Sequence, residues 1–289
     1  MDIRAILMGL VFAFMWSSAF TSARIIVADA SPLLALSARY LISGLLGVGI
    51  ALALGQSWRL TPPQWRATII FGIFQNAMYL GLNFVAMQTV EASLAAIIAS
   101  TMPLLVGFAA WVFLGEKLRP LGIAGLIAGV VGVAIIMGAR LSGGVDLTGV
   151  ALCVVGVIAL TVATMMVRGA TSGGNFLMIV GLQMLVGCLA LSLATVLFET
   201  PRVNPTWPLF WAFTYTCLVP GLAATMIWFW LVNRIGATRA ATFHFLNPFF
   251  GVAVAAALLS EALGARDVLG VGIIAAGILA VQISRQKQG

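Results

Sequence analysis

The stretch Ala92–Gly132, ASLAAIIASTMPLLVGFAAWVFLGEKLRPLGIAGLIAGVVG, returns in altered form 145 residues later as Ala237–Gly277, ATRAATFHFLNPFFGVAVAAALLSEALGARDVLGVGIIAAG. The two stretches align without a gap and are identical at ten positions: Ala92/Ala237, Ala95/Ala240, Ala96/Ala241, Pro103/Pro248, Ala110/Ala255, Leu114/Leu259, Glu116/Glu261, Leu118/Leu263, Gly125/Gly270 and Gly132/Gly277. Both are too apolar to be soluble. A hydrophobic chain built from two related halves is typical of secondary transporters, which bind their substrate between the halves.

The composition predicts a membrane protein. The chain is 62% hydrophobic and 8% charged, against about 25% charged in an ordinary soluble domain. Ten apolar runs are each long enough to cross a hydrocarbon core of about 30 Å: residues 3–27, 32–54, 65–87, 92–114, 120–139, 147–168, 175–198, 207–233, 238–260 and 267–284. The loops leave no room for a soluble catalytic domain, and there is no G-x-x-x-x-G-K-[ST] loop for ATP. We interpret the first run as a retained helix rather than a signal peptide, because it is long and lacks a basic start.

The lysine and arginine counts predict the orientation in the membrane. With the N-terminus inside, ten such residues lie on the inner side: Arg4, Arg59, Arg66, Lys117, Arg119, Arg168, Arg234, Arg239, Arg285 and Lys287. Four lie on the outer side: Arg24, Arg140, Arg202 and Arg266. Both termini are therefore expected to be cytoplasmic. The formal charge of +7 follows from this topology and does not indicate nucleic-acid binding.

The repeat and the topology together predict an all-α integral membrane protein with two inverted five-helix repeats. The units are residues 1–140 and 147–285, and fainter matches at an offset of 144 extend the repeat to the first spans: Ala19/Ala163, Arg24/Arg168 and Leu33/Leu177. Because each unit has an odd number of spans, the second enters the membrane upside down relative to the first. Inverted halves allow a site at mid-membrane to open alternately to either side.

At this point the sequence resembles a known family, the EamA-type drug/metabolite transporter superfamily. The resemblance rests on these residues: Trp16-Ser17-Ser18-Ala19-Phe20, Pro32, Arg39-Tyr40, Pro103, Leu114-Gly115-Glu116, Pro248, Ser260-Glu261-Ala262-Leu263 and Gly270. Within the superfamily the chain is most similar to the bacterial aromatic amino acid exporters, which implies efflux of amino acids and related metabolites across the inner membrane. Ser260 stands where the pattern has glycine, so the end of this helix is expected to depart from the symmetry of the repeat.

Polar side chains follow one another along the third span. Gln75, Tyr79 and Asn83 lie at i, i+4 and i+8, with Asn76 beside them. On a helix this spacing forms one stripe, and polar groups in lipid tend to face the protein interior or a wet cavity. Amides and a phenol suit an amino acid's carboxylate and ammonium. The alternative is that the amides bridge neighbouring helices.

Three prolines interrupt apolar spans: Pro103, Pro220 and Pro248. Each removes an amide donor, and Pro248 leaves the carbonyl of His244 without its helical partner. Such a carbonyl is expected to accept a hydrogen bond from a substrate ammonium, or the proline acts only as a kink or hinge.

His244 and Asn247 lie three residues apart in the ninth span, and His244 is the chain's one histidine. It is a candidate proton carrier or substrate contact, the alternative being a neutral histidine in the core. Candidate rings that stack on a planar substrate are Trp16, Phe20, Tyr215, Trp228 and Trp230. Arg39 is expected to do structural work, by snorkelling or by pairing with helix-end carbonyls.

We therefore predict a multi-pass transporter of the inner membrane that exports neutral, aromatic amino acids and related metabolites by alternating access. No Asp or Glu lies deep in a span, which favours facilitated efflux. The substrate-binding candidates are Trp16, Gln75, Asn76, Tyr79, Asn83, Tyr215, Trp228, His244 and Asn247. The alternative is an exporter of other metabolites or cationic drugs, with proton coupling through His244. A channel or an enzyme is disfavoured. We expect no cofactor, metal or nucleic acid; the partners are the solute and the bilayer, with monomer and homodimer both open.

Overall fold

The computed structural model describes residues 3–116, 119–166, 173–236 and 240–286. Within these ranges the structure is helical, and one isolated β-bridge joins Ala30 and Val203. The elements are α1 (Ile3–Asp29), α2 (Pro32–Ala53), α3 (Pro62–Phe71), η1 (Gly72–Tyr79), α4 (Leu80–Ala86), α5 (Ala92–Ser100), α6 (Met102–Leu114), α7 (Pro120–Ser142), α8 (Leu147–Met166), α9 (Phe176–Phe198), α10 (Trp207–Thr216), η2 (Cys217–Ala223), α11 (Ala224–Ile235), η3 (Thr242–Leu246), α13 (Asn247–Leu259) and α14 (Ala265–Gln286). They form ten spans long and apolar enough to cross a membrane, which confirms the prediction of ten transmembrane helices.

The repeat in the sequence reappears in the element boundaries. The helices α3 and α10 begin and end 145 residues apart, and so do α6 and α13. The third span of each half also contains a π-helix, η1 and η2, and their first residues, Gly72 and Cys217, are again 145 residues apart. The chain therefore consists of two five-span halves that share the same sequence of helix breaks.

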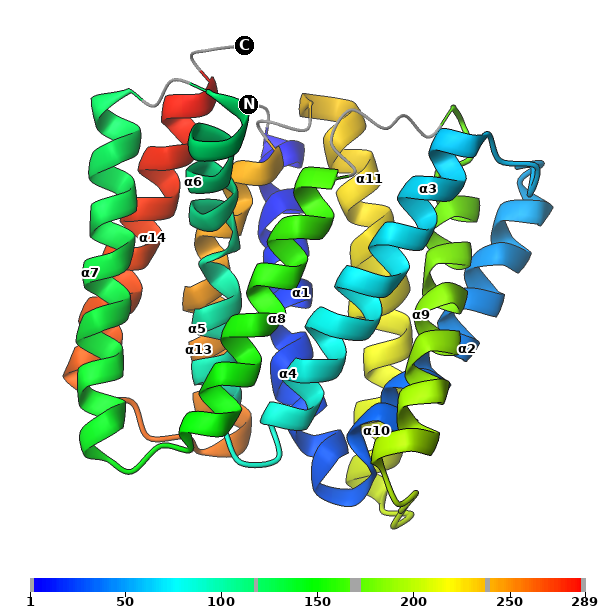
Figure 1. Ribbon diagram of the computed structural model, residues 1–289, viewed down its shortest axis with the longest axis horizontal. Helices are drawn as coiled ribbons and strands as arrows, with labels where there is room; N and C mark the ends of the chain where they lie inside the picture. The colour runs from blue at the N-terminus through cyan, green and yellow to red at the C-terminus, as the bar shows by residue number, and fades with distance from the viewer. Residues whose placement is uncertain (1–2, 117–118, 167–172, 237–239, 287–289) are drawn as a thin grey trace.

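The two halves run in opposite directions. The start of α1 and the end of α14 lie at one end of the bundle, which we call proximal, whereas α8 starts at the opposite, distal end (Figure 1). The orientation in the membrane remains a prediction, in which the proximal end is cytoplasmic. Four of the basic residues on which this prediction rests lie outside the described residues: Lys117, Arg168, Arg239 and Lys287.

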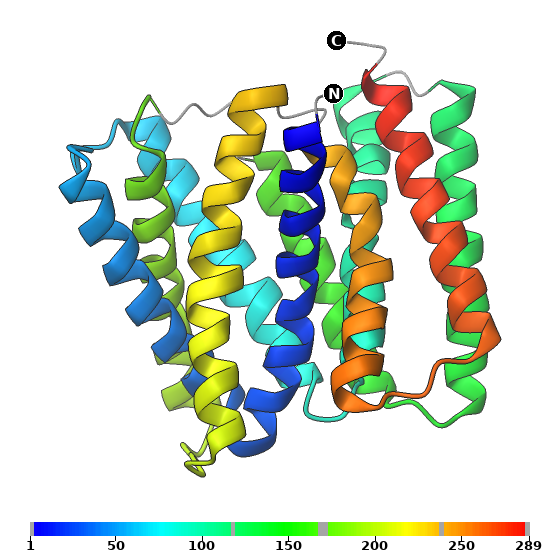
Figure 2. The same ribbon diagram turned by 180° about the vertical axis from the view of Figure 1, so that it is seen from behind.

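Paired helices form the two edges of the bundle. α7 and α14 make one edge and α2 and α9 the other, with α1, α5, α8 and α13 between them (Figures 1 and 2). The α7–α14 contact depends on the repeated glycines. A Cβ added to Gly125 would lie 2.7 Å from the Gly277 carbonyl, and one on Gly132 would lie 2.9 Å from the Gly270 carbonyl. Close backbone approach through small residues is the usual way to pack membrane helices.

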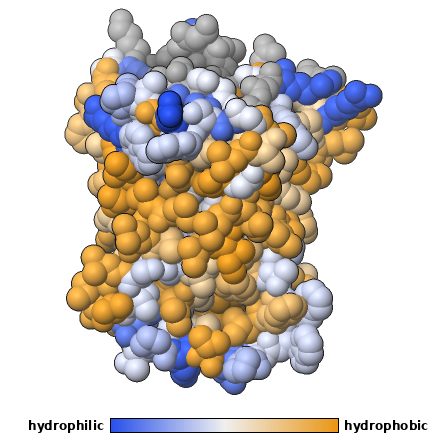
Figure 3. Space-filling model, turned by 90° about the vertical axis from the view of Figure 1, so that its right-hand side faces the viewer, coloured by the Kyte–Doolittle hydropathy of each residue, from blue (hydrophilic) through white to orange (hydrophobic). Residues whose placement is uncertain are grey.

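On the face drawn in Figure 3, a hydrophobic belt lies between two hydrophilic ends. Large apolar side chains of the spans stay exposed, as Val196 and Phe198 do at 80% each. In a bilayer such side chains contact lipid, whereas in water they would be a severe liability.

Side chains of one half cap helices of the other half. At the distal end, the Glu261 carboxylate follows α13 and accepts hydrogen bonds from the N–H groups of Ala92 (2.8 Å) and Ser93 (3.0 Å), which begin α5. Glu199, after α9, accepts from the second and third residues of α2 at 2.9 and 3.1 Å. At the proximal end, Gln56 accepts from the third residue of α9 at 3.0 Å. Each contact satisfies amides that a helix start leaves unpaired.

The end of α13 keeps the geometry of its counterpart despite its different sequence. Gly115 ends α6 with φ of 65°, in the left-handed region, and Ser260 ends α13 with φ of 54°. Ser260 is the one non-glycine residue with positive φ among those described. The expected loss of symmetry at this position is therefore not seen. Serine adopts a conformation that costs a side-chain-bearing residue free energy.

Candidate functional site

Four rings from three spans meet in the proximal half of the bundle, and we call them the aromatic cluster: Phe12, Trp16, Trp228 and His244. The Phe12 ring centroid lies 4.7 Å from that of Trp228 and 5.5 Å from that of His244, the latter edge-on at 88°. The Trp228 and His244 centroids are 5.3 Å apart. Trp16 lies 5.8 Å from Phe12 and 6.5 Å from His244. The structure thus brings together three of the expected site residues, and such a cluster can stack on a planar group.

Asn247 adds hydrogen-bonding groups to the aromatic cluster. Its Nδ2 lies 2.9 Å from Nδ1 of His244, and since an amide nitrogen only donates, the ring nitrogen accepts and Nε2 carries the proton. The Oδ1 atom of Asn247 is buried and has no hydrogen-bond partner among the described residues. Buried acceptors are normally paired with protein or water. Asn247 therefore presents a carbonyl oxygen suited to a donor such as an ammonium group.

The three prolines lie where helix geometry changes. Pro103 and Pro248 stand in the first turn of α6 and α13, and Pro220 lies inside η2. The segment before Pro248, η3, is a 3₁₀-helix, in which the Asn247 N–H bonds to the His244 carbonyl. This carbonyl is therefore already satisfied, contrary to the expectation that it is free to bind an ammonium. A role as hinges remains a prediction for all three prolines.

The polar stripe of the third span lies apart from the aromatic cluster. Asn76 donates to the Gln183 carbonyl of α9 at 2.9 Å, and Asn83 donates to the Tyr79 carbonyl of its own span at 2.8 Å. Tyr79 and Asn83 pack against the bare backbone of Gly156 on α8. The Asn76 amide therefore bridges two spans, as in the alternative interpretation of this stripe, whereas the Asn83 amide donates within its own span. The fourth member, Gln75, is half-buried.

Tyr215 also makes a contact between helices. Its hydroxyl lies 2.7 Å from Ser18 Oγ on α1. Ser18 donates its own proton to the Met15 carbonyl at 2.9 Å, so Tyr215 is the donor. The adjacent Thr216 donates to Ser22 of α1 at 2.7 Å. These bonds tie α10 to α1 and leave the Tyr215 hydroxyl engaged.

Sequence reasoning missed Phe12 and the buried hydroxyls of Ser17, Thr21 and Ser93. Together with Asn83 and Asn247, these three residues have a hydroxyl or amide oxygen without a hydrogen-bond partner among the described residues, and they lie on α1 and on three helices that contact it, α4, α5 and α13. Ser17 and Thr21 are four residues apart, so they share one face of α1. An unpaired buried polar group is costly, whereas a solute or water in the bundle would satisfy it. Phe12 carries no sequence signal, because it is one of 17 phenylalanines.

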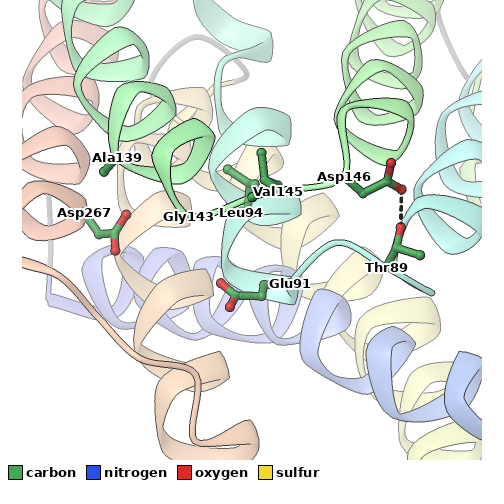
Figure 4. Close-up of a pocket in the computed structure, with 9 residues that line it drawn as sticks. Thr89, Glu91, Leu94, Ala139, Gly143, Val145, Asp146 and Asp267 are labelled. Carbon is green, nitrogen blue, oxygen red and sulfur yellow. Dashed lines mark hydrogen bonds between the residues drawn. The ribbon is translucent and has the colours of Figure 1, made fainter.

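A separate pocket of about 380 Å³ opens at the distal end (Figure 4). Three carboxylates line it, those of Glu91, Asp146 and Asp267. Asp146 accepts from the Thr89 hydroxyl at 2.6 Å, and this bond, with amides at the start of α8, holds its carboxyl pKa below the ordinary value. In the described part of the chain no three metal-ligating side chains are placed to hold an ion.

A bundle of ten spans, made of two inverted halves with broken helices and a central cluster of aromatic and polar groups, has the architecture of a secondary transporter. The EamA-like transporter family matches the chain twice, over residues 3–138 and 147–283. The chain therefore belongs to the EamA-like transporter family. It is a multi-pass protein of the bacterial inner membrane.

Two relatives carry the name of transporter. The chain is 31% identical over 149 residues, half of its length, to "Uncharacterized transporter YvbV" of Bacillus subtilis. It is 27% identical over 127 residues, 44% of its length, to the "S-adenosylmethionine/S-adenosylhomocysteine transporter" of Chlamydia trachomatis. The chain spans only 48% and 39% of these two relatives. A solved structure described as "Crystal structure of protein" covers all of both chains with a TM-score of 0.67 at 21% identity, and so has the same fold.

Proposed function

We propose that this transporter exports neutral amino acids with aromatic side chains from the cytoplasm by alternating access. The observation that carries the proposal is the aromatic cluster with Asn247 beside it. Trp16 and Trp228 supply faces on which a ring can stack, and the Asn247 Oδ1 atom supplies an acceptor for the ammonium. In the predicted orientation this site lies on the cytoplasmic side of mid-membrane, where an exporter first binds its cargo.

The helix breaks provide the means of moving the site from one side to the other. Pro103 and Pro248 occupy equivalent positions in the two halves, at the break in the middle of the fourth and ninth spans. A proline weakens the helix at that point because its nitrogen makes no hydrogen bond. We infer that the distal segments of these spans swing about the breaks, so that the halves exchange conformations.

Transport follows the gradient of the solute in this proposal. Among the described residues the carboxylates lie at the ends of spans or in loops. His244 is then the one titratable side chain of the aromatic cluster. Proton coupling through His244 is the alternative mechanism.

The test is efflux from proteoliposomes that contain purified protein and no energy source. The liposomes are loaded with labelled phenylalanine, tryptophan or threonine. Faster efflux of the two aromatic amino acids, and its loss in Trp228→Ala, would support the proposal. Trp58→Ala is the matched control, because Trp58 is 62% exposed in the loop before α3. Efflux of all three amino acids at the rate of protein-free liposomes would refute the proposal. Efflux only under a pH gradient would make His244 the coupling residue.

A second candidate cargo is a cationic metabolite such as S-adenosylmethionine. It is favoured by the name of the chlamydial relative and by the three carboxylates of the distal pocket. The same liposomes loaded with labelled S-adenosylmethionine distinguish the two. If this cargo leaves faster than phenylalanine, and Glu91→Gln slows it, the second candidate replaces the first.

A further inference from the structure

Arg39 is a buried cation whose charge the fold does not balance. It is the eighth residue of α2, counted from the distal end, and is 6% exposed. Its Nε has no hydrogen-bond partner, and no carboxylate pairs with its guanidinium among the described residues. Its closest aromatic contact is the adjacent Tyr40, with Cζ 5.2 Å from the ring centroid. The expected pairing with helix-end carbonyls is not formed, and an unpaired buried charge is costly.

The guanidinium faces a stretch of bare backbone in η2. A Cβ added to Gly221 would lie 3.8 Å from Arg39 Nη2, 3.4 Å from Ser43 Oγ and 3.1 Å from the Thr216 carbonyl. Pro220, next to Gly221, has no N–H to donate. Short π-helical turns within longer helices are frequent at functional sites. Arg39 therefore lies beside a position where η2 offers no side chain.

In the first half, a side chain occupies the position equivalent to Gly221. The offset of 145 that relates η2 to η1 makes Asn76 the counterpart of Gly221. The offset of 144 that relates the starts of α2 and α9 makes Gln183 the counterpart of Arg39. In the first half's π-helix, the Asn76 amide occupies the contact and donates to the Gln183 carbonyl at 2.9 Å. At Gly221 the amide is missing, and a positive charge stands opposite.

We propose that Arg39, Ser43 and Gly221 form a binding site for the carboxylate of the transported solute. The planar guanidinium matches a carboxylate with two parallel hydrogen bonds, and Gly221 places no side chain beside the guanidinium. Ionisable residues inside a membrane commonly mark a substrate path. The identification of the carboxylate as part of an amino acid rests on the proposed function.

This site is a second binding site for the solute, on the distal side of the aromatic cluster. Gly221 and Trp228 lie on the same span seven residues apart, which is about two helical turns, or ~10 Å. A solute that leaves the aromatic cluster toward the distal end meets Arg39 next. The charge then attracts acids and discriminates against solutes that lack a carboxylate.

The first test measures binding without transport. The thermal unfolding midpoint of the purified protein is recorded with 3-phenylpropionate and with its neutral analogue, 3-phenylpropionamide, because a ligand of the folded state raises this midpoint. We expect the acid alone to raise it in the wild type and in Arg266→Gln, which removes an exposed charge at the same end. We expect the acid not to raise the midpoint of Arg39→Gln. We also expect no rise in Gly221→Asn, which introduces the side chain that Asn76 has at the equivalent position and keeps Arg39. Equal rises with acid and amide, or a wild-type rise in Arg39→Gln, would overturn the proposal.

The second test separates this site from the proposed function. Efflux of phenylalanine is compared with efflux of phenylalaninamide, which lacks the carboxylate. Loss of a hydrogen-bonded charge contact weakens binding by about 10–100-fold, so Arg39→Gln should slow phenylalanine efflux by that factor at low concentration and leave phenylalaninamide unchanged. If the wild type moves neither compound but keeps the acid-specific thermal shift, the proposed function fails and the site stands. If Arg39→Gln exports phenylalanine like the wild type, the site fails and the function stands.

Discussion

Replacement of Glu261 by alanine should destabilise the bundle at its distal end. The carboxylate accepts two backbone hydrogen bonds, from Ala92 at 2.8 Å and Ser93 at 3.0 Å, and so joins the end of α13 to the start of α5. A hydrogen bond to a charged group contributes about 1.5–3 kcal/mol when it is buried. Because Glu261 is half-buried, we take the lower part of that range and expect a loss of about 3–4 kcal/mol for the two bonds together.

The assay is equilibrium unfolding in mixed micelles with increasing mole fraction of SDS. Glu261→Gln keeps one acceptor oxygen, so about half of the loss should remain in that variant. Glu199→Ala removes the same double contact from the start of α2 and should cost a similar amount. Arg266→Gln changes the charge beside this contact without removing an acceptor and is the control. A Glu261→Ala variant within about 0.5 kcal/mol of the wild type, the range of an ordinary surface change, would refute the reasoning.

Three further predictions concern single positions. Ser260→Gly should raise the unfolding free energy by up to about 1 kcal/mol in the same assay, because glycine adopts the left-handed conformation without strain; a lower value would contradict this. Gly132→Leu should cost about 3 kcal/mol through collision with the backbone of α14, whereas Gly272→Leu, which meets nothing within 4 Å, should be tolerated. Asp146 stabilises α8 fully above its ordinary pKa of 3.8, and the stabilisation fades as pH falls through its lower folded-state pKa. Thr89→Val removes the hydrogen bond that lowers the Asp146 pKa, so the stabilisation should be lost at a higher pH than in the wild type. The unfolding midpoint measured as a function of pH tests this, and an unchanged profile would refute the role of Thr89.

The fold was predictable because the features that determine it, the apolar spans and the internal repeat, can both be identified directly in the sequence. Span length and apolar composition set the ten helices, and the offset of 145 set the two halves, down to the matched ends of α6 and α13. The left-handed turn at Ser260 was not predictable, because serine gives no local signal for positive φ.

The candidate site was predictable only in part. His244 and Asn247 are neighbours in sequence, and their contact follows from that spacing. The stripe on the third span was interpreted with α-helical geometry, but η1 is a π-helix over Gly72–Tyr79. A π-turn contains more residues per turn than an α-turn, so the spacing of four from Gln75 to Tyr79 inside η1 does not return to the same face. Tyr79 and Asn83 both lie against Gly156 of α8, whereas Asn76 faces α9.

The matched positions of η1 and η2 indicate the order in which the π-turn and the duplication arose. A π-turn arises when one residue is inserted into an α-helix, and an insertion at the same register in both halves is far simpler to explain once than twice. The wide turn is therefore older than the duplication. The unit that was duplicated therefore already had this turn, and its two copies have since diverged at matched positions such as Asn76 and Gly221.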